Sequence, residues 1–330
     1  MEMMTVEQAI YQALAEEMQR DNRVIAMGEG IATKQLQLVE AFGKERVRNT
    51  PLAEAVVAGT AVGAAASGLR PVIDMLFAPF LSYAMDALVN SAGKLRQISG
   101  GQFEFPLVTL AMTGSGWCVG GQHNHNLEAA FVHMPGLKVL MPSTPADFKG
   151  LLKSAIRDNN PVLLFTDLGL LHSQGEVPRD TDYLVPLAKA AIRRIGTDVT
   201  LVSYAKTVAV CELAATQLAE QGIEAEVIDL RCLKPLDETT VLASVRKTGR
   251  LVCVHEASGL CGMAAELSAL VAEKAFESLR APVMRVTGAD ATPPASWMLE
   301  QVGVPSVQNI MGAVIDQVAI KTMPAAYRLS

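Results

Sequence analysis

A single glutamate, Glu54, is the residue of this sequence whose setting is most suited to chemistry. It follows the turn at residues 49–53 and opens a run of small residues, AVVAGTAVGAAAS, that ends at Ser67. A carboxylate in such apolar surroundings is expected to share a proton with a partner group, and groups of this kind cluster at functional sites. Gly59 and Gly63 lie on one face of the predicted helix and allow another backbone to approach closely. We therefore predict a functional role for Glu54, at the start of a helix built for tight contact.

A second acid and a glycine-rich loop provide further candidates. Glu29 follows the predicted strand 24–27 at a tight turn, where ligands bind in open parallel sheets, although capping of a neighbouring helix explains it equally well. Residues 120–126, GGQHNHN, place His123 and His125 after another predicted strand. Imidazoles in such loops act as acids, bases or donors near neutral pH. Hydrogen bonding within the loop is the alternative for both histidines.

Several familiar motifs are absent from the sequence. No G-x-G-x-x-G follows a predicted strand, and there is no Walker lysine loop and no H-E-x-x-H. The G-x-S-x-G elbow of serine hydrolases is missing as well. The usual nucleotide, zinc and hydrolase sites therefore have no support.

Composition limits the class of protein. The 330 residues suggest about two domains, and half of them are hydrophobic. A net charge of −6 argues against a nucleic-acid partner. The five cysteines have no paired spacing, which fits a reducing compartment and argues against a cysteine-rich metal site. No signal-like segment opens the chain and no apolar run reaches the roughly 20 residues that span a bilayer, so we predict a soluble cytoplasmic protein.

Strand-like segments alternate with helical ones, which predicts an α/β protein with parallel, doubly wound sheets. In the first half the predicted strands are 24–27, 71–77, 105–110, 138–141 and 161–165. Residues 166–197 are rich in Gly, Pro and Asp and break the rhythm, and the second half then repeats it with strands at 198–204, 225–230, 250–254 and 282–286. We predict a first domain over 1–180, a linker over 181–197 and a second domain over 198–330. His255 and Glu256, at the end of a strand, are expected to lie at the surface or at an interface.

Short motifs spread over nearly the whole chain are similar to those of one family. They are MGE (27–29), TPLAE (50–54), VGAAASGLRP (62–71), QH (122–123), PGLKV (135–139), KGLL (149–152), AIRDNNP (155–161), VIDLR (227–231), LKPLD (233–237) and KTGRLV (247–252). Together they resemble the beta subunit of the thiamine-diphosphate-dependent first component of 2-oxo acid dehydrogenase complexes. Pyruvate, branched-chain 2-oxo acid and acetoin dehydrogenases belong to this family. The resemblance implies two doubly wound domains, of the thiamine-diphosphate pyrimidine-binding type and then the transketolase C-terminal type.

The resemblance also implies roles for individual residues. Glu54 corresponds to the glutamate that hydrogen-bonds the aminopyrimidine ring and favours the imino form, which takes the proton from the thiazolium carbon. Phe80 and Leu76 correspond to an aromatic residue and an apolar wall beside that ring, and Glu29 to a second acid near the cofactor. His123 corresponds to the histidine that serves acyl transfer to the lipoyl group.

Metal ions and partners follow from the same resemblance. Family members hold a structural K⁺ with main-chain carbonyls, which maps to Leu107, Ala155, Asp158 and Asn160. The Gly-Asp-Gly motif that holds Mg²⁺ and the diphosphate is absent from this chain and, in the family, lies on a separate alpha subunit. The resemblance thus implies half of an active site, an α2β2 assembly with self-association of the beta subunits, and a lipoyl acyltransferase core as acyl acceptor.

Three departures from the family pattern fall near the expected thiazolium pocket. Pro79 stands where an acidic or amide residue is usual, His125 follows His123 in an altered loop, and the segment 30–53 is several residues shorter. The expected activity is decarboxylation of a small 2-oxo acid, pyruvate first, with acetoin cleavage as the alternative. A split transketolase acting on sugar phosphates and a non-catalytic assembly subunit are the other two hypotheses. The sequence has no obvious basic cluster to hold a phosphate, which argues against a transketolase. The retention of Glu54 and His123 argues against a non-catalytic assembly subunit.

Overall fold

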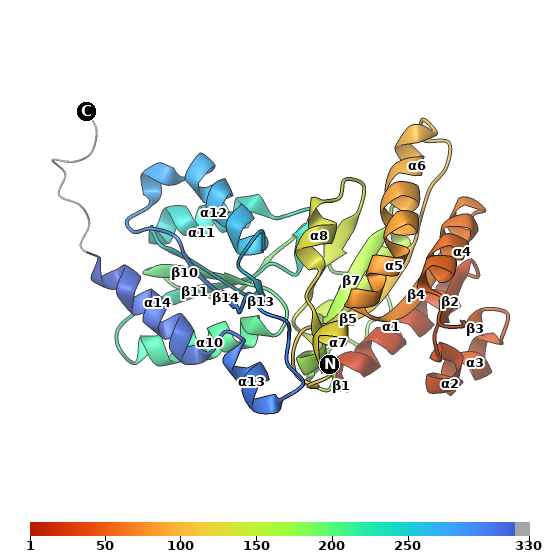
Figure 1. Cartoon of the computed structure of the whole chain (residues 1–330), viewed down its shortest axis with the longest axis horizontal. Coiled ribbons are helices and arrows are strands. Elements are labelled where there is room, and N and C mark those ends of the chain that lie inside the picture. Colours follow the sequence, from red (N-terminus) through yellow and green to blue (C-terminus); the bar gives the residue numbers. More distant parts are fainter. Residues whose placement is uncertain (321–330) are drawn as a thin grey trace.

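The computed structural model describes residues 1–320 and contains two α/β domains that lie side by side (Figure 1). The first domain is built on a seven-stranded sheet with the order β12-β6-β7-β5-β4-β2-β3. The second is built on a five-stranded sheet with the order β14-β13-β10-β11-β9. Residues 321–330, the last of the predicted second domain, lie outside the described residues. Within residues 1–320, no helix has both the length and the apolar composition needed to cross a membrane.

The first sheet is parallel except at one edge. Its strands are β2 (Val24–Gly28), β3 (Val47–Asn49), β4 (Arg70–Phe77), β5 (Val108–Thr113), β6 (Lys138–Leu140), β7 (Val162–Asp167) and β12 (Cys232–Lys234). The edge strand β12 comes from the second half of the chain and pairs antiparallel with β6. The predicted strand 105–110 begins three residues later than expected, because Pro106 has no N–H to give to a ladder.

Helices cover both faces of the first sheet, as its apolar strands require. α1 (Val6–Arg20) and α9 (Pro145–Arg157) pack on one face. α4 (Glu54–Ala66), α5 (Leu81–Met85) and the π-helical segment η2 (Asp86–Ala92), which continues into α6 (Gly93–Ile98), pack on the other. Side chains alternate between the two faces along a strand. Accordingly, Val24 and Ala26 pack in the hydrophobic cluster with α1 and α9, whereas Met27 packs in the cluster with α4 and α5.

Local signals in the sequence set where several helices begin. A capping box opens α1, since the Thr5 side chain accepts from Gln8 N and the Gln8 side chain accepts from Thr5 N. Thr144 caps α9, with its hydroxyl accepting from Asp147 N at 3.2 Å. The short segment 30–53, in which no element is predicted from the sequence, forms α2 (Ile31–Lys34), α3 (Leu36–Phe42) and β3.

The second domain repeats the pattern of the first. Its strands are β9 (Ala191–Arg194), β10 (Val199–Ser203), β11 (Ala225–Asp229), β13 (Leu251–Ser258) and β14 (Met284–Gly288), and its helices are α10 (Thr207–Ala219), α11 (Glu238–Thr248), α12 (Met263–Lys274), α13 (Trp297–Val302) and α14 (Val307–Ala319). α10 and α14 pack on one face, and α11 and α12 on the other. β9 lies within the predicted linker 181–197 and pairs antiparallel with β11.

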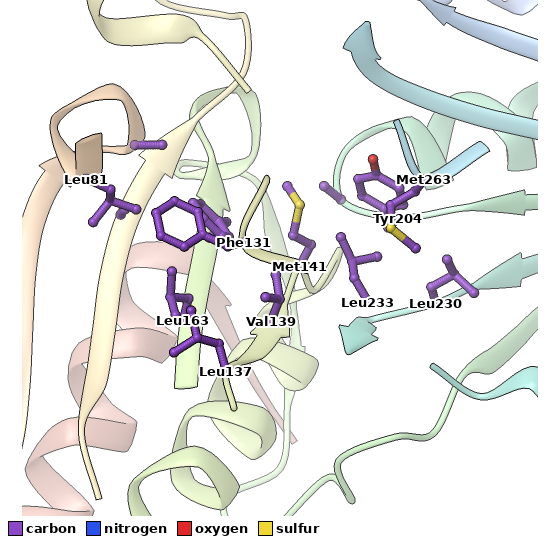
Figure 2. Packing of buried hydrophobic residues seen from close by; sticks show 14 of the residues in the cluster. Leu81, Phe131, Leu137, Val139, Met141, Leu163, Tyr204, Leu230, Leu233 and Met263 are labelled. Atoms are coloured by element: carbon purple, nitrogen blue, oxygen red, sulfur yellow. The ribbon is translucent and has the colours of Figure 1, made fainter. Parts of the chain in front are cut away.

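One hydrophobic cluster runs through both domains. Figure 2 shows Phe131, Val139 and Met141 of the first domain beside Leu233 of the edge strand β12 and Tyr204 of the second domain. The cluster therefore ties the second sheet to the α4 face of the first, which is also the face that leads to the candidate site.

Buried ion pairs hold the chain where it leaves the first domain. Lys149 and Lys153 of α9 are fully buried, and both pair with Glu16 of α1, at 2.8 and 2.6 Å. Lys149 Nζ also donates to Pro178 O at 3.0 Å, and Lys153 Nζ to Thr181 O. A buried ammonium is stable only when it is fully partnered, so these lysines fix the segment around residues 178–181. That segment follows β8 (Gln174–Val177), which pairs antiparallel with β1 (Glu2–Thr5).

Candidate active site

Two predicted acids come together at the carboxyl ends of the parallel strands. Glu29 follows β2, Glu54 is the first residue of α4, and both line a small pocket together with Leu76 at the end of β4. Within residues 1–320, neither the Glu29 nor the Glu54 carboxylate takes part in a hydrogen bond or an ion pair. Both carboxylates are therefore free to accept hydrogen bonds from a ligand.

A third acid, Asp74, closes the floor of this pocket. β2 and β4 pair with Gly28 opposite Asp74, and a Cβ on residue 28 would lie 2.5 Å from Asp74 O, so only glycine allows this approach. Burial raises the pKa of Asp74, the hydrogen bond from Leu76 N and the charge of Lys34 oppose that rise, and the charge of Glu29 adds to it. Because of this raised pKa, Asp74 resists ionisation more than an exposed aspartate does.

Leu76 is presented to the pocket by an unusual backbone conformation. Its φ is +57°, in the left-handed region that costs a branched residue on the order of 1 kcal/mol or more. The register between β4 and β5 shifts between Asp74 and Phe77, so a bulge surrounds Leu76. Leu76 N donates to Asp74 Oδ1 at 3.0 Å, which holds the turn in place. Bulges and strained residues of this kind are typical of active sites.

His123 lies against two phenylalanines at the end of the same strand. It is part of the single-turn helix α7 (Gly121–Asn124), and its ring meets Phe77 edge-on with centroids 4.8 Å apart. It also meets Phe80, of the 3₁₀ turn η1 (Ala78–Phe80), at 5.3 Å. The Nδ1 atom of His123 is buried and has no hydrogen-bond partner in the part of the chain that the structure describes. His125, by contrast, is exposed.

The end of β4 therefore joins the two groups of predicted residues. Leu76 lines the pocket of Glu29 and Glu54, and the next residue, Phe77, contacts His123. Phe80 reaches the same site by packing on His123. The structure thus brings Glu29, Glu54 and Leu76 together in one pocket and Phe80 and His123 together beside it.

The chemistry of the pocket suits a neutral heteroaromatic ring. It offers two free carboxylates and the apolar Leu76. Phe80 and His123 do not line it but pack on each other beyond the end of β4, where His123 Nδ1 has no hydrogen-bond partner among residues 1–320. None of the residues that line the pocket is basic, so nothing there suits a phosphate group. Among residues 1–320, no group of three or more His, Cys, Asp or Glu side chains could hold a metal ion. The residues present fit the aminopyrimidine ring of thiamine diphosphate, the part of that cofactor that carries no phosphate.

The carbonyls predicted to hold potassium lie near the end of α9. Two of them already accept backbone hydrogen bonds, Leu107 O from Val162 N at 2.9 Å and Ala155 O from Asp158 N at 3.2 Å. Asp158 O accepts from the Arg70 guanidinium at 3.1 Å. The Asn160 side chain and backbone N–H both donate to the Asp158 carboxylate at 2.8 Å. Each carbonyl keeps a second lone pair, and a potassium site at these four residues stays a prediction.

His255 differs from its sequence-based prediction. It is buried, stacks on Tyr204 with centroids 5.7 Å apart, and its Nε2 accepts from Ala264 N at 3.1 Å. Burial lowers its pKa to about 4. The prediction of a surface position for His255 was wrong, because the strand β13 continues to Ser258 and carries His255 into the core. The interface role holds for the neighbouring Glu256, which accepts from Ser115 N of the first domain.

An ion-pair cluster at the domain junction was not expected from the sequence. Lys206 pairs with Glu256 and lies 3.7 Å from Asp167, which ends β7. Burial raises the pKa of Asp167 to about 8, the charge of Lys206 opposes this rise, and the charge of Glu256 adds to it. Lys206 also donates to Ser115 O at 2.8 Å. The cluster therefore fixes the loop after β5 against the second domain.

Sequence reasoning missed two residues of the site itself, Asp74 and Phe77. Asp74 is an acid between the apolar residues Ile73 and Met75 of β4, and this was a usable signal. Phe77 gave no signal, because only the bulge turns it toward His123.

Two family models match the chain. "Transketolase, pyrimidine binding domain" covers residues 2–173, which include every residue of the candidate site, and "Transketolase, C-terminal domain" covers residues 188–310. The pyruvate dehydrogenase E1 component subunit beta of Rhizobium meliloti (strain 1021) is 42% identical over 318 residues, which are 94% of this chain and 69% of that protein. The chain belongs to this family of beta subunits.

Other members of the beta-subunit family carry a different name. The acetoin:2,6-dichlorophenolindophenol oxidoreductase subunit beta of Cupriavidus necator (strain ATCC 17699) is also 42% identical, over 328 residues that cover 94% of this chain and 96% of that protein. A solved structure titled as a split-gene transketolase in an inactive beta4 tetramer has a TM-score of 0.81 at 24% identity, with 96% of this chain and 99% of that chain covered. At this identity it shows the shared fold alone.

Proposed function

We propose that this chain is the beta subunit of an α2β2 thiamine-diphosphate-dependent 2-oxo acid dehydrogenase, with pyruvate as the first substrate to test. The observation that carries the proposal is the pocket of Glu29, Glu54 and Leu76, whose carboxylates have no partner among residues 1–320. A charged group left without partners in a half-buried pocket is costly unless a ligand satisfies it. Membership of a family that includes pyruvate dehydrogenase beta subunits supports the same reaction class.

Glu54, Glu29, Leu76 and Phe80 would hold the aminopyrimidine end of the cofactor. The chemistry that bound thiamine diphosphate supplies is a carbon nucleophile for the substrate carbonyl and a temporary acceptor for the electrons released with carbon dioxide. Glu54 would share a proton with a nitrogen of the aminopyrimidine ring. Leu76 and Phe80 would exclude water from the reacting atoms, which strengthens the electrostatic contacts made there.

His123 would act in the second half of the reaction, when the acyl group passes to a lipoyl disulfide. As the bond between the acyl carbon and one sulfur forms, the sulfur–sulfur bond breaks, and the departing sulfur takes up a proton. The bond that held the acyl carbon to its carrier would then break and leave its electron pair on the carrier. An imidazole is suited to deliver that proton near neutral pH. The contacts with Phe77 and Phe80, 4.8 and 5.3 Å between ring centroids, support a fixed position for this ring beyond the end of β4.

A second chain is part of the proposal, because the pocket contains nothing basic for the diphosphate. The outer face of α4 supports such a partner: Val56 is 65% exposed, and a Cβ on Gly59 or Gly63 would meet no atom of residues 1–320 within 4 Å. We place an alpha subunit with a Gly-Asp-Gly motif and Mg²⁺ opposite the pocket. Self-association of the beta subunit and docking to a lipoyl acyltransferase core complete the proposed assembly.

Acetoin cleavage is the second candidate function. It rests on the acetoin oxidoreductase beta subunit that is 42% identical to this chain, as close as the pyruvate dehydrogenase relative from Rhizobium meliloti. Pro79 is the second residue of the 3₁₀ turn that carries Phe80, so its unusual identity bears on the acyl donor. A split transketolase is disfavoured by the absence of basic residues from the pocket.

A cytoplasmic location stays a prediction, since beta subunits named mitochondrial are equally similar.

The first experiment is to tag the chain in its native host, identify what co-purifies, and assay the complex on pyruvate and on acetoin. We expect a partner that carries Gly-Asp-Gly and turnover that depends on thiamine diphosphate. Glu54→Gln in this complex should assemble normally yet lose most of the turnover. Full activity of that variant would refute the role of Glu54. A chain that purifies alone and binds no thiamine diphosphate with Mg²⁺ would instead favour a non-catalytic assembly subunit.

A further inference from the structure

The loop that carries His123 depends on the other domain for its shape. Between β5 and α7 the backbone is in the positive-φ region at Gly114, Gly116, Cys118 and Gly120. Such a loop has few regular backbone hydrogen bonds of its own, so its N–H groups need other acceptors. Two carboxylates of the second domain act as these acceptors. Glu256 accepts from Ser115 N, and Glu300 accepts from Gly116 N and Cys118 N.

Glu300 is the more extensively bonded of these two acceptors. Its carboxylate accepts from Gly116 N at 3.0 Å, from Cys118 N at 3.3 Å and from Asn124 Nδ2 at 2.7 Å. The Cys118 thiol adds a fourth contact at 3.4 Å. A buried carboxylate is stable only when such donors surround it, and Glu300 is 2% exposed.

The helix that carries Glu300 has no other buried side chain. α13 has six residues and lies at the edge of the second domain, on the side toward α7 (Figure 1). Four apolar residues of α13 are instead largely exposed: Trp297, Met298, Leu299 and Val302. Hydrophobic burial therefore does not explain why α13 sits against the first domain, whereas the carboxylate of Glu300 does.

Asn124 connects Glu300 to the candidate catalytic ring. It is 1% exposed and is the immediate neighbour of His123 in α7. Its Nδ2 donates to Glu300, and its backbone oxygen accepts from Gly114 N at 3.2 Å, which closes the loop on itself. Since α7 is a single turn, a shift of Asn124 moves His123 with it.

We propose that Glu300 is a positioning residue: through Asn124 it lets the second domain set the place of the His123 ring for acyl transfer. The inference rests on the proposed function of His123. Its physical basis is that a misplacement of about 1 Å in a reacting group can cost on the order of 100-fold in rate. A loop that lost three hydrogen bonds to Glu300 would allow His123 a displacement of that size.

The test compares two half-reactions of the complete α–β complex. One is oxidation of the 2-oxo acid with an artificial dye as electron acceptor, and the other is acyl transfer to a free lipoyl domain. In Glu300→Ala, acyl transfer should fall by about 100-fold, whereas dye reduction should fall by less than about fivefold. Glu273→Ala, an exposed glutamate on α12 of the same domain, is the matched control and should change neither rate.

A reversal of the hydrogen bond separates positioning from general damage. Asn124→Asp places two carboxylates face to face and should impair acyl transfer as Glu300→Ala does. Adding Glu300→Gln returns a donor–acceptor pair and should recover at least tenfold of the lost rate. Hydrogen exchange at Gly116 N and Cys118 N, followed by mass spectrometry, should speed up in Glu300→Ala whether or not the complex is active.

Each result has a defined meaning. If the unmodified complex turns over neither pyruvate nor acetoin, the proposed function fails. If it is active but Glu300→Ala lowers both half-reactions equally, or the double variant recovers nothing, the positioning role is overturned. Unchanged exchange at Gly116 and Cys118 would overturn it independently of catalysis.

Discussion

Replacing a glycine of α4 by alanine should raise the stability of the isolated chain and lower its affinity for a partner subunit. Gly59 is the sixth residue of the 13-residue helix α4, and Gly312 is the sixth residue of the 13-residue helix α14. At both positions an added Cβ would meet no atom of residues 1–320 within 4 Å. Gly59→Ala and Gly312→Ala are therefore the same change in the same helical setting, on two different surfaces.

Both variants should stabilise the isolated chain. Alanine in a helix interior is favoured over glycine by roughly 1 kcal/mol. For a domain of about 150–250 residues, that corresponds to a rise in the melting temperature of about 2–4 °C. No clash opposes this gain, because both positions are exposed.

Only Gly59→Ala should weaken assembly with the alpha subunit. If another backbone packs on α4, an extra methyl group overfills the contact and costs about 1–3 kcal/mol. At 1.4 kcal/mol per tenfold change, the affinity should fall by about 5- to 150-fold. Thermal unfolding of the isolated chain and sedimentation with its partner measure the two effects. Assembly of Gly59→Ala with the affinity of Gly312→Ala would refute the idea that α4 is a subunit interface.

Two further predictions concern histidines. His123→Ala should impair transfer to the lipoyl group at least tenfold more than the first carbon–carbon cleavage, with His125→Ala as the exposed control; equal loss in both half-reactions would contradict the role of His123. For His255, the pKa of about 4 lies below the ordinary 6.5, so the unfolded chain binds the proton first, and stability should fall as the pH drops from about 6.5 toward 4. At 1.36 kcal/mol per pKa unit the loss is at most about 3 kcal/mol. In urea unfolding between pH 7 and pH 4, His255→Gln should lose correspondingly less stability, and an equal loss in both proteins would show that another group is responsible.

Much of the fold could be predicted because its signals are local. Caps at Thr5 and Thr144 and the alternation of apolar strands with helices depend only on neighbours in the sequence. The β9 strand was missed inside 181–197, since its pairing with β11 is antiparallel and joins residues about 35 positions apart. His255 was misplaced for a similar reason: the length of β13 is set by its partners β10 and β14.

For the candidate site, the sequence by itself determined which residue types were available. Glu29, Glu54, Leu76, Phe80 and His123 were recognised from turns, strand ends and family motifs. Only the tertiary structure decided how they meet, because the bulge that points Leu76 into the pocket and Phe77 at His123 arises from the pairing of β4 with β5. The bond from Glu300 to Asn124 spans 176 positions. No local pattern encodes such a contact, since it exists only when the two domains pack together.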